Sequence, residues 1–187
     1  MPTGPQPRAL GSAPTTLLVL QAMQGIILNE ALVGGVSPFA ALSAADAARY
    51  GVSKAVFVGR PKDFRDGYLP QCCLWIPERD EPQQPVELVG FSTGRVQDDL
   101  EVTVQAFVDL RTDWYLAEQK ILQIRDALWP AMLHHVLLGG TVPSVIDADA
   151  REGRGFCFEQ IAGTDYRCYE AIWSVQQTYN IAGGRVV

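Results

Sequence analysis

The chain has 187 residues, 48% of them hydrophobic, which is enough for one ordinary domain with a single core. Its formal net charge of -6 and isoelectric point near 4.9 argue against a protein that binds nucleic acid through its phosphates, because such proteins carry basic surfaces. Its 4 cysteines include an adjacent pair and do not form the framework of a small disulfide-stapled domain. We therefore expect reduced thiols and a cytoplasmic protein.

Proline and glycine dominate the first 14 residues, a composition that cannot form a packed core. We expect residues 1–14 to be a flexible arm that partners order, and residues 15–187 to form one domain. The most apolar N-terminal run, residues 17–28, is shorter than the roughly 20 apolar residues that span a membrane. Arg8 alone is a weak basic start for a signal peptide. Neither a membrane anchor nor a secreted protein is predicted.

Two helices and two strands are predicted in the first part of the domain. A threonine at position 15 or 16 can cap a helix that continues to about residue 32. Ser37-Pro38 has the pattern of a cap and a first turn, and it predicts a second short helix that ends at Gly51. Buried strands are expected at residues 55–58 and 72–76.

A charged loop stiffened by prolines separates these strands from the centre of the domain. It begins with Glu78, Arg79, Asp80 and Glu81, and an extended run follows at residues 86–91. We expect the loop to join two strands of a hairpin and to project into the solvent or toward a neighbouring molecule.

An alternating strand followed by an amphipathic helix forms the centre of the predicted domain. Apolar residues at every second position from Leu100 to Val108 predict a half-buried strand with one solvent-exposed face. A helix is expected after this strand. Pro130 lies inside it and should kink or restart it, and the helix would extend to Leu138. Asp113 can cap this helix, and its apolar stripe consists of Ala117, Ile121, Ile124 and Leu128.

The C-terminal part is predicted to contain a loop and an aromatic hairpin. Residues 141–155 have the pattern of a loop with a brief strand at 142–146, and longer strands are expected at 156–161 and 166–179. Together, the elements predict an α+β fold, a small mixed or antiparallel sheet with helices packed on one face.

No group of residues has the pattern of a catalytic, cofactor or metal site. His134-His135 are adjacent, so on a helix their side chains point about 100° apart and cannot bind one metal as an i, i+4 pair can. Cys72-Cys73 lack a second motif that would complete a zinc site. Asp147-x-Asp149 begins like a calcium loop, but Arg151 occupies the third ligand position. We predict a protein that is not an enzyme and holds no cofactor.

The order of these elements resembles that of the tail-terminator proteins of long-tailed bacteriophages. The resemblance covers residues 15–180 and is one of pattern, without a signature motif. It rests on the first helix, the strand ending in Val58-Gly59-Arg60-Pro61, the long hairpin loop, the alternating strand, the helix from Asp113 to Trp129 and the terminal aromatic hairpin. The second helix and the proline-rich arm are additions to this pattern.

The resemblance implies a ring-forming subunit, most simply in a hexamer, that caps the head-proximal end of the tail tube and ends tube polymerisation. The expected partners are further copies of the chain, the major tail-tube protein and head-completion or neck proteins, in a virion assembled in the host cytoplasm. The loop residues Glu78–Glu81 would contact the tube or a neighbouring subunit. The acidic cluster of Asp98, Asp99 and Glu101 would line a lumen through which DNA passes without specific binding, or face the outer solvent as charge runs usually do.

Two other interpretations stay open. Within the same class, the chain could be another neck or head-completion protein. From a different class, it could be a small cysteine-dependent or metal-dependent enzyme, which bound metal or thiol reactivity would reveal.

Overall fold

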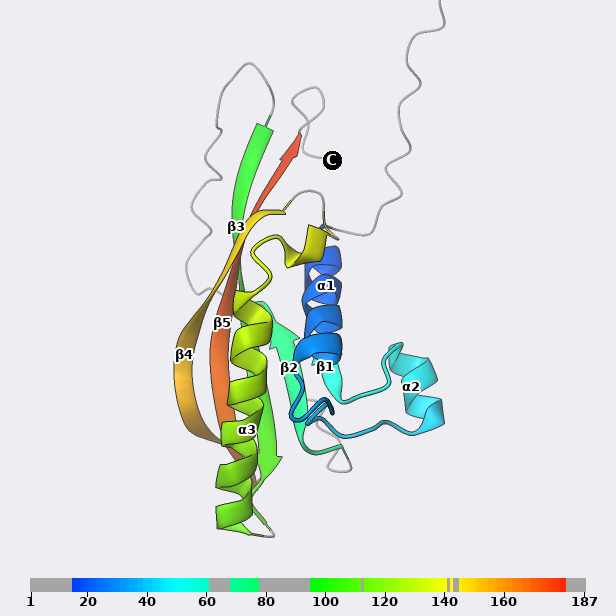
Figure 1. The fold of residues 1–187 in the computed structure, drawn as a ribbon, viewed down its shortest axis with the longest axis vertical. Coiled ribbons are helices and arrows are strands. Elements are labelled where there is room, and N and C mark those ends of the chain that lie inside the picture. The colour runs from blue at the N-terminus through cyan, green and yellow to red at the C-terminus, as the bar shows by residue number, and fades with distance from the viewer. Residues whose placement is uncertain are drawn as a thin grey trace, which may run out of the picture.

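A five-stranded mixed sheet forms the centre of the computed structural model (Figure 1). The strands lie in the order β1-β2-β3-β5-β4, and β1 pairs with β2 in parallel while every other pairing is antiparallel. The strands are β1 (Val56–Val58), β2 (Gln71–Trp75), β3 (Arg95–Asp109), β4 (Val145–Ile161) and β5 (Thr164–Asn180). The α+β class and the mixed sheet predicted from the sequence are therefore confirmed.

The structure describes residues 15–60, 68–77, 95–111, 113–140, 142 and 145–180. The predicted arm at 1–14, the loop with Glu78, Arg79, Asp80 and Glu81, and the run at 86–91 lie outside the described residues. None of the described helices is long and apolar enough to cross a membrane.

Two long helices cover one face of the sheet (Figure 1). The first, α1 (Thr15–Glu30), contacts β1 and β2, and α3 (Trp114–Leu133) contacts α1 and the three long strands. Their apolar sides meet the inner face of the sheet in one core, in which Trp173 of β5 is fully buried. Area removed from water at this contact stabilises the fold, at roughly 25 cal/mol for each Å² of apolar surface.

The sequence of α3 accounts for where it begins and which side it buries. Asp113 adopts an extended backbone and its carboxylate accepts hydrogen bonds from the N–H groups of Tyr115 at 2.8 Å and Leu116 at 3.2 Å. The predicted stripe is confirmed, because all four of its residues are buried, namely Ala117, Ile121, Ile124 and Leu128.

The predicted extension of the helix to Leu138 is wrong. The helix continues through Pro130 and ends at Leu133, and the N–H of His134 still donates to the carbonyl of Pro130 at 3.0 Å. Proline removes one backbone hydrogen bond, but burial of Ala131 and Met132 in the core offsets that loss. A short 3-10 turn, η2 (Leu138–Gly140), follows after a gap.

The second helix is shorter than predicted. α2 (Ala44–Tyr50) is capped by Ser43, whose hydroxyl accepts from the N–H of Asp46, and it ends at Gly51 as expected. The segment before Ser43 is not helical, because its backbone bonds to other segments instead, with Ala40 donating to the carbonyl of Pro70 at 2.9 Å. Tertiary hydrogen bonds therefore override the local pattern of Ser37-Pro38.

Two predictions about the long strands are also wrong. The expected loop at 141–155 is largely the first half of β4, which accommodates Gly153 and Gly155 by a change of register between Glu152 and Gly155. The face of β3 that was expected to be exposed to solvent is buried at Thr103 and Gln105. Farther along this face, Cys73, Phe107, Tyr166 and Cys168 form a second, smaller apolar cluster.

We expect Asp113→Ala to lower the free energy of unfolding by about 1 kcal/mol, because two helix N–H groups lose their acceptor. Asp113→Asn is the matched control, since asparagine caps helices about as well as aspartate. Urea unfolding of both variants measures the difference. Equal stability of the two variants would contradict this account of the helix start.

Candidate functional surface

Acidic side chains from two strands gather on the face of the sheet opposite to the helices. Asp99 and Glu101 of β3 and Asp147 and Asp149 of β4 line a depression of about 440 Å³, together with polar residues of β5. The intervening positions, such as Val102 and the alanines at 148 and 150, are buried in the core beneath the helices. Strand alternation therefore places these four carboxylates on the uncovered face, and we call them the acidic strip.

Side chains of described residues contact two of the four carboxylates of the strip. Arg151 lies with its Nη2 2.9 Å from Oε1 of Glu101, and Gln176 donates a hydrogen bond to Asp99 at 3.2 Å. Asp147 and Asp149 are exposed. Within the described part of the chain, no group of three or more His, Cys, Asp or Glu residues could hold a metal ion. The carboxylates of the strip give this face a negative electrostatic field.

Sequence reasoning found half of this strip. Asp99 and Glu101 were predicted and lie together, while the side chain of Asp98 is outside the described residues. Asp147 and Asp149 were considered only as a calcium loop, in a segment expected to be irregular. The alternation of these two aspartates with alanines is typical of a strand. The local sequence does not give the register with β5 that places them on the same face as Asp99 and Glu101.

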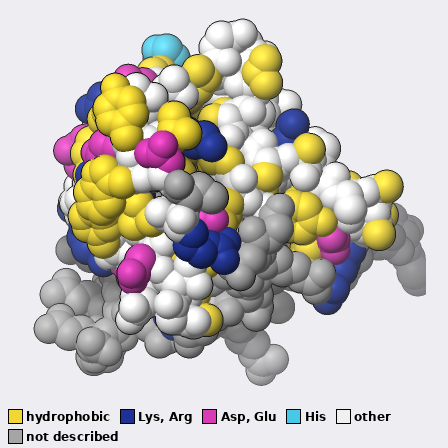
Figure 2. All heavy atoms as spheres, turned by 90° about the horizontal axis from the view of Figure 1, so that it is seen from below, with side chains coloured by type: hydrophobic (Ala, Val, Ile, Leu, Met, Phe, Trp, Pro, Cys, Tyr) yellow, Lys and Arg dark blue, Asp and Glu magenta, His cyan; other side chains and the backbone are white. Residues whose placement is uncertain are grey.

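An exposed aromatic patch lies at the other end of the molecule, on the helix side. We define it as Trp114, Phe156 and Phe158, which keep 60%, 38% and 51% of their surfaces exposed. Trp114 at the start of α3 stacks on Phe158 of β4, with 5.3 Å between ring centroids. Figure 2 looks at this end and shows hydrophobic side chains gathered at the surface. Exposed apolar groups of this size, held together, are typical of contact surfaces.

An ion pair fixes the patch to the sheet. Arg167 of β5 donates from Nε and Nη2 to the carboxylate of Glu118 at 2.6 and 2.9 Å, and its guanidinium lies 4.5 Å from the ring centroid of Phe158. The hydrogen bonds from Arg167 lower the pKa of Glu118 below its ordinary value. Helix, strand and aromatic ring are thereby held in one arrangement.

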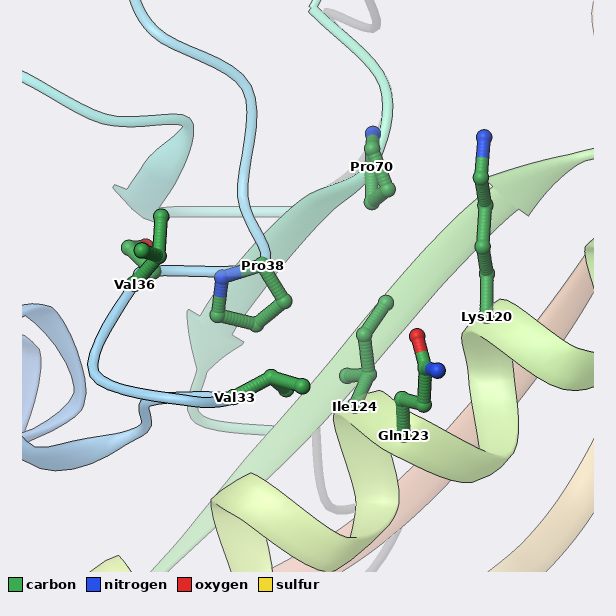
Figure 3. A pocket seen from close by; sticks show the side chains of 8 residues that line it. Val33, Val36, Pro38, Pro70, Lys120, Gln123 and Ile124 are labelled. Atoms are coloured by element: carbon green, nitrogen blue, oxygen red, sulfur yellow. The ribbon is translucent and has the colours of Figure 1, made fainter.

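A separate pocket of about 270 Å³ lies between α3 and the loop that follows α1 (Figure 3). Val33 and Pro38 extend toward Ile124, while Lys120 and Gln123 rise from the helix toward Pro70. The pocket is at the small end for ligand sites. Its lining includes no carboxylate, thiol or imidazole, so it offers no pair of groups for acid–base or nucleophilic chemistry.

His135 contacts a carboxylate at the end of another helix, and the adjacent cysteines are packed in the interior. Nε2 of His135 lies 2.6 Å from Oε2 of Glu30, which joins the end of α3 to the end of α1. Cys72 and Cys73 are buried, and burial raises the pKa of both thiols, that of Cys73 to about 12. Neither thiol is suited to act as a nucleophile at neutral pH.

We expect Glu118→Gln to lower the stability by about 0.5–1 kcal/mol at pH 7, the range for a well-formed but partly exposed pair. The pKa of Glu118 is lowered by folding, so its contribution is present above the ordinary value of 4.5 and is lost as the pH falls through the lowered pKa. Denaturant unfolding at pH 7 and pH 3 should show a smaller deficit at pH 3 than at pH 7.

Glu152→Gln is the matched control for this experiment, because Glu152 is 50% exposed and lies 3.5 Å from Arg125. Its replacement should cost less than that of Glu118 at pH 7. A Glu118→Gln deficit that is unchanged at pH 3 would show that the charge of the pair is not its cause.

Comparison with models of known protein families finds no match to this chain, and comparison with curated proteins finds none either. The resemblance to tail terminators thus rests on the order of the elements and stays a prediction. The surfaces described above are the basis for assigning a function.

Proposed function

We propose that this chain is a structural virion protein of the tail-terminator type, which forms a ring on the head-proximal end of a phage tail tube and ends its polymerisation. The ring, most simply of six subunits, would dock to neck proteins of the head. The fold supports this proposal, since the family is expected to have a small mixed sheet with helices on one side and the chain has that arrangement.

The acidic strip is the observation that carries the proposal. Four carboxylates lie on the face of the sheet that the helices leave uncovered, and Arg151 pairs with one of them, that of Glu101. If that face lines the lumen of a ring, the strips of all subunits add their fields where the aperture is narrow. DNA would then pass without adhering, because like charges repel within a Debye length of about 8 Å at physiological salt.

The two edges of the sheet favour assembly into a closed ring. β1 and β4 are the terminal strands of the sheet, and β4 has 17 residues. An edge of this length is a template for unwanted pairing unless it is covered or blunted. Head-to-tail contacts between subunits would cover part of both edges and close a ring. Charged residues on β4, among them Arg151, Glu152 and Arg154, limit pairing with unrelated strands.

Another neck or head-completion protein is the alternative within the same class, and it would share the ring and the acidic lumen. The position in the virion separates the two, because a terminator contacts the last ring of tube protein. A small cysteine-dependent or metal-dependent enzyme is the alternative of another class. The described residues offer it no metal cluster, and the buried thiols of Cys72 and Cys73 are poor nucleophiles, so such an enzyme would have to use the half-buried Cys157, whose pKa is lowered to about 7.

Deletion of the gene in a producing phage should yield tail tubes of irregular, extended length that do not join heads. The protein itself should measure as a closed oligomer by native mass spectrometry, and a ring should be seen at the head-proximal end of wild-type tails by electron microscopy. A strictly monomeric protein, in solution and in virions, would overturn the ring. Tubes of normal length in the deletion would instead favour a neck protein.

Asp147→Lys should make the ring bind duplex DNA with a steep salt dependence, because each new phosphate contact releases counterions. The matched control is Asp126→Lys, which makes the same charge change at an exposed position of α3 on the helix side. DNA retention measured against salt concentration compares the two rings. Equal binding by both variants would remove the assignment of the acidic strip to the lumen and leave the capping role untouched.

A further inference from the structure

Two cysteines face each other across the ladder between β4 and β5. Cys157 and Cys168 are direct partners in the register, and each thiol influences the pKa of the other, while the thiol of Cys168 donates to the backbone carbonyl of Tyr166 at 3.6 Å. Direct partners in antiparallel strands have Cα atoms about 4.5–5.5 Å apart, within the range of about 4.4–6.8 Å that disulfides need. Both thiols are free. The backbone is therefore already placed for a bond between them.

The two thiols differ in access. Cys157 is half-buried on β4, the edge strand of the sheet, whereas Cys168 is buried on the neighbouring strand. A reagent in solution therefore reaches Cys157 first, and Cys168 lies opposite it on the neighbouring strand. This is the arrangement of an attacking thiol with a resolving thiol.

Charged groups on both strands surround this pair. Arg154 and Glu159 of β4 and Glu170 of β5 form an ion cluster beside it, in which Nε of Arg154 lies 2.8 Å from Oε2 of Glu170. Arg167 donates to the backbone carbonyl of Cys157 at 3.2 Å. Gly153 leaves room for Glu170, since a Cβ at that position would lie 2.9 Å from Oε1 of Glu170 and the carboxylate would have to shift.

These surroundings favour the thiolate of Cys157. The neighbouring thiol of Cys168 lowers the pKa of Cys157 to about 7, the positive charge of Arg154 acts in the same direction, and burial and Glu170 oppose them. Gln105 of β3 adds a weak hydrogen bond to Sγ, at 3.9 Å. The neighbouring Cys157 and burial raise the pKa of Cys168. The thiolate is the nucleophilic form of cysteine.

We propose that Cys157 and Cys168 are a modification site, a dithiol that reacts with small-molecule disulfides and closes to an intramolecular disulfide. The thiolate of Cys157 attacks one sulfur of the small disulfide, whose S–S bond breaks, and the first small thiolate leaves and takes up a proton. Cys168 then loses its proton to solvent and attacks Sγ of Cys157, which releases the second small thiolate, protonated in turn. The protein pair loses two electrons and the small disulfide gains them. This inference does not depend on the ring, and it requires only that the part of the β4 edge around Cys157 stays outside the contacts between subunits.

The test is incubation of the folded protein with oxidised glutathione, followed by intact mass spectrometry and peptide mapping without reduction. Wild-type protein should lose two hydrogens and yield a cross-linked peptide pair that contains Cys157 and Cys168. Cys168→Ser should stop at the mixed disulfide and keep one glutathione, while Cys157→Ser should take up none in the same time. Circular dichroism checks that both variants are folded, and the mapping of wild-type protein needs no variant at all.

Three results would overturn the proposal. One is wild-type protein that keeps both thiols reduced under conditions in which a free peptide thiol is oxidised. A second is a cross-link that joins other cysteines, and a third is modification of Cys157→Ser as fast as of wild-type protein. As a further check, alkylation of Cys157 by iodoacetamide should reach half its maximal rate near pH 7. A midpoint at the ordinary thiol value of about 8.5 would remove Cys157 as the attacking group.

Discussion

The pairing of β5 with both of its neighbours is the constraint on which the rest of the structure depends. β5 is in register with β3 from Asp109 to Arg95 and with β4 from Ile161 to Val145. Because side chains alternate along each strand, this double register decides at once which residues of three strands share a face. A shift by one residue would move Trp173 out of the core and the acidic strip beneath the helices. The core and the candidate surface are therefore set by the same hydrogen bonds.

The uncovered face of the sheet has two halves with different chemistry. Toward the hairpin turn, Phe107, Tyr166 and Cys168 fill the face with apolar groups, and the rings of Phe107 and Tyr166 pack edge to face with 6.3 Å between their centroids. Beyond the register change near Gly155, the strip carries its carboxylates. A single sheet can thus present one half that is closed by its own side chains and another that stays hydrated. Only the hydrated half is suited to face a polyanion without binding it.

The sequence predicted the elements that carry a local signal and missed those whose signal is tertiary. Asp113 and the stripe from Ala117 to Leu128 depend on helix geometry alone, so the position of α3 followed from spacing. The first half of β4 contains Gly153 and Gly155, which locally indicate a turn, and becomes a strand only because β5 provides a ladder for it. The candidate surface was half predicted for the same reason. Asp99 lies in a strand that its own sequence pattern indicates, whereas Asp147 lies in a strand that forms only because β5 pairs with it.

The two ends of β4 differ in role: the first half packs in the core, and the second half carries the cysteine of the proposed dithiol. At its start, alternate alanines are buried under α3 and hold the strand to the core. Past the register change, the strand turns Phe156 and Phe158 outward on the helix side and Cys157 toward β5 on the other. An edge strand has hydrogen-bonding partners on one side only, so it yields more easily than a central strand when two sulfurs must approach. Because the dithiol lies at this edge, the backbone of β4 can move as the proposed disulfide forms. A pair of cysteines on β3 and β5, two central strands, would lack this freedom.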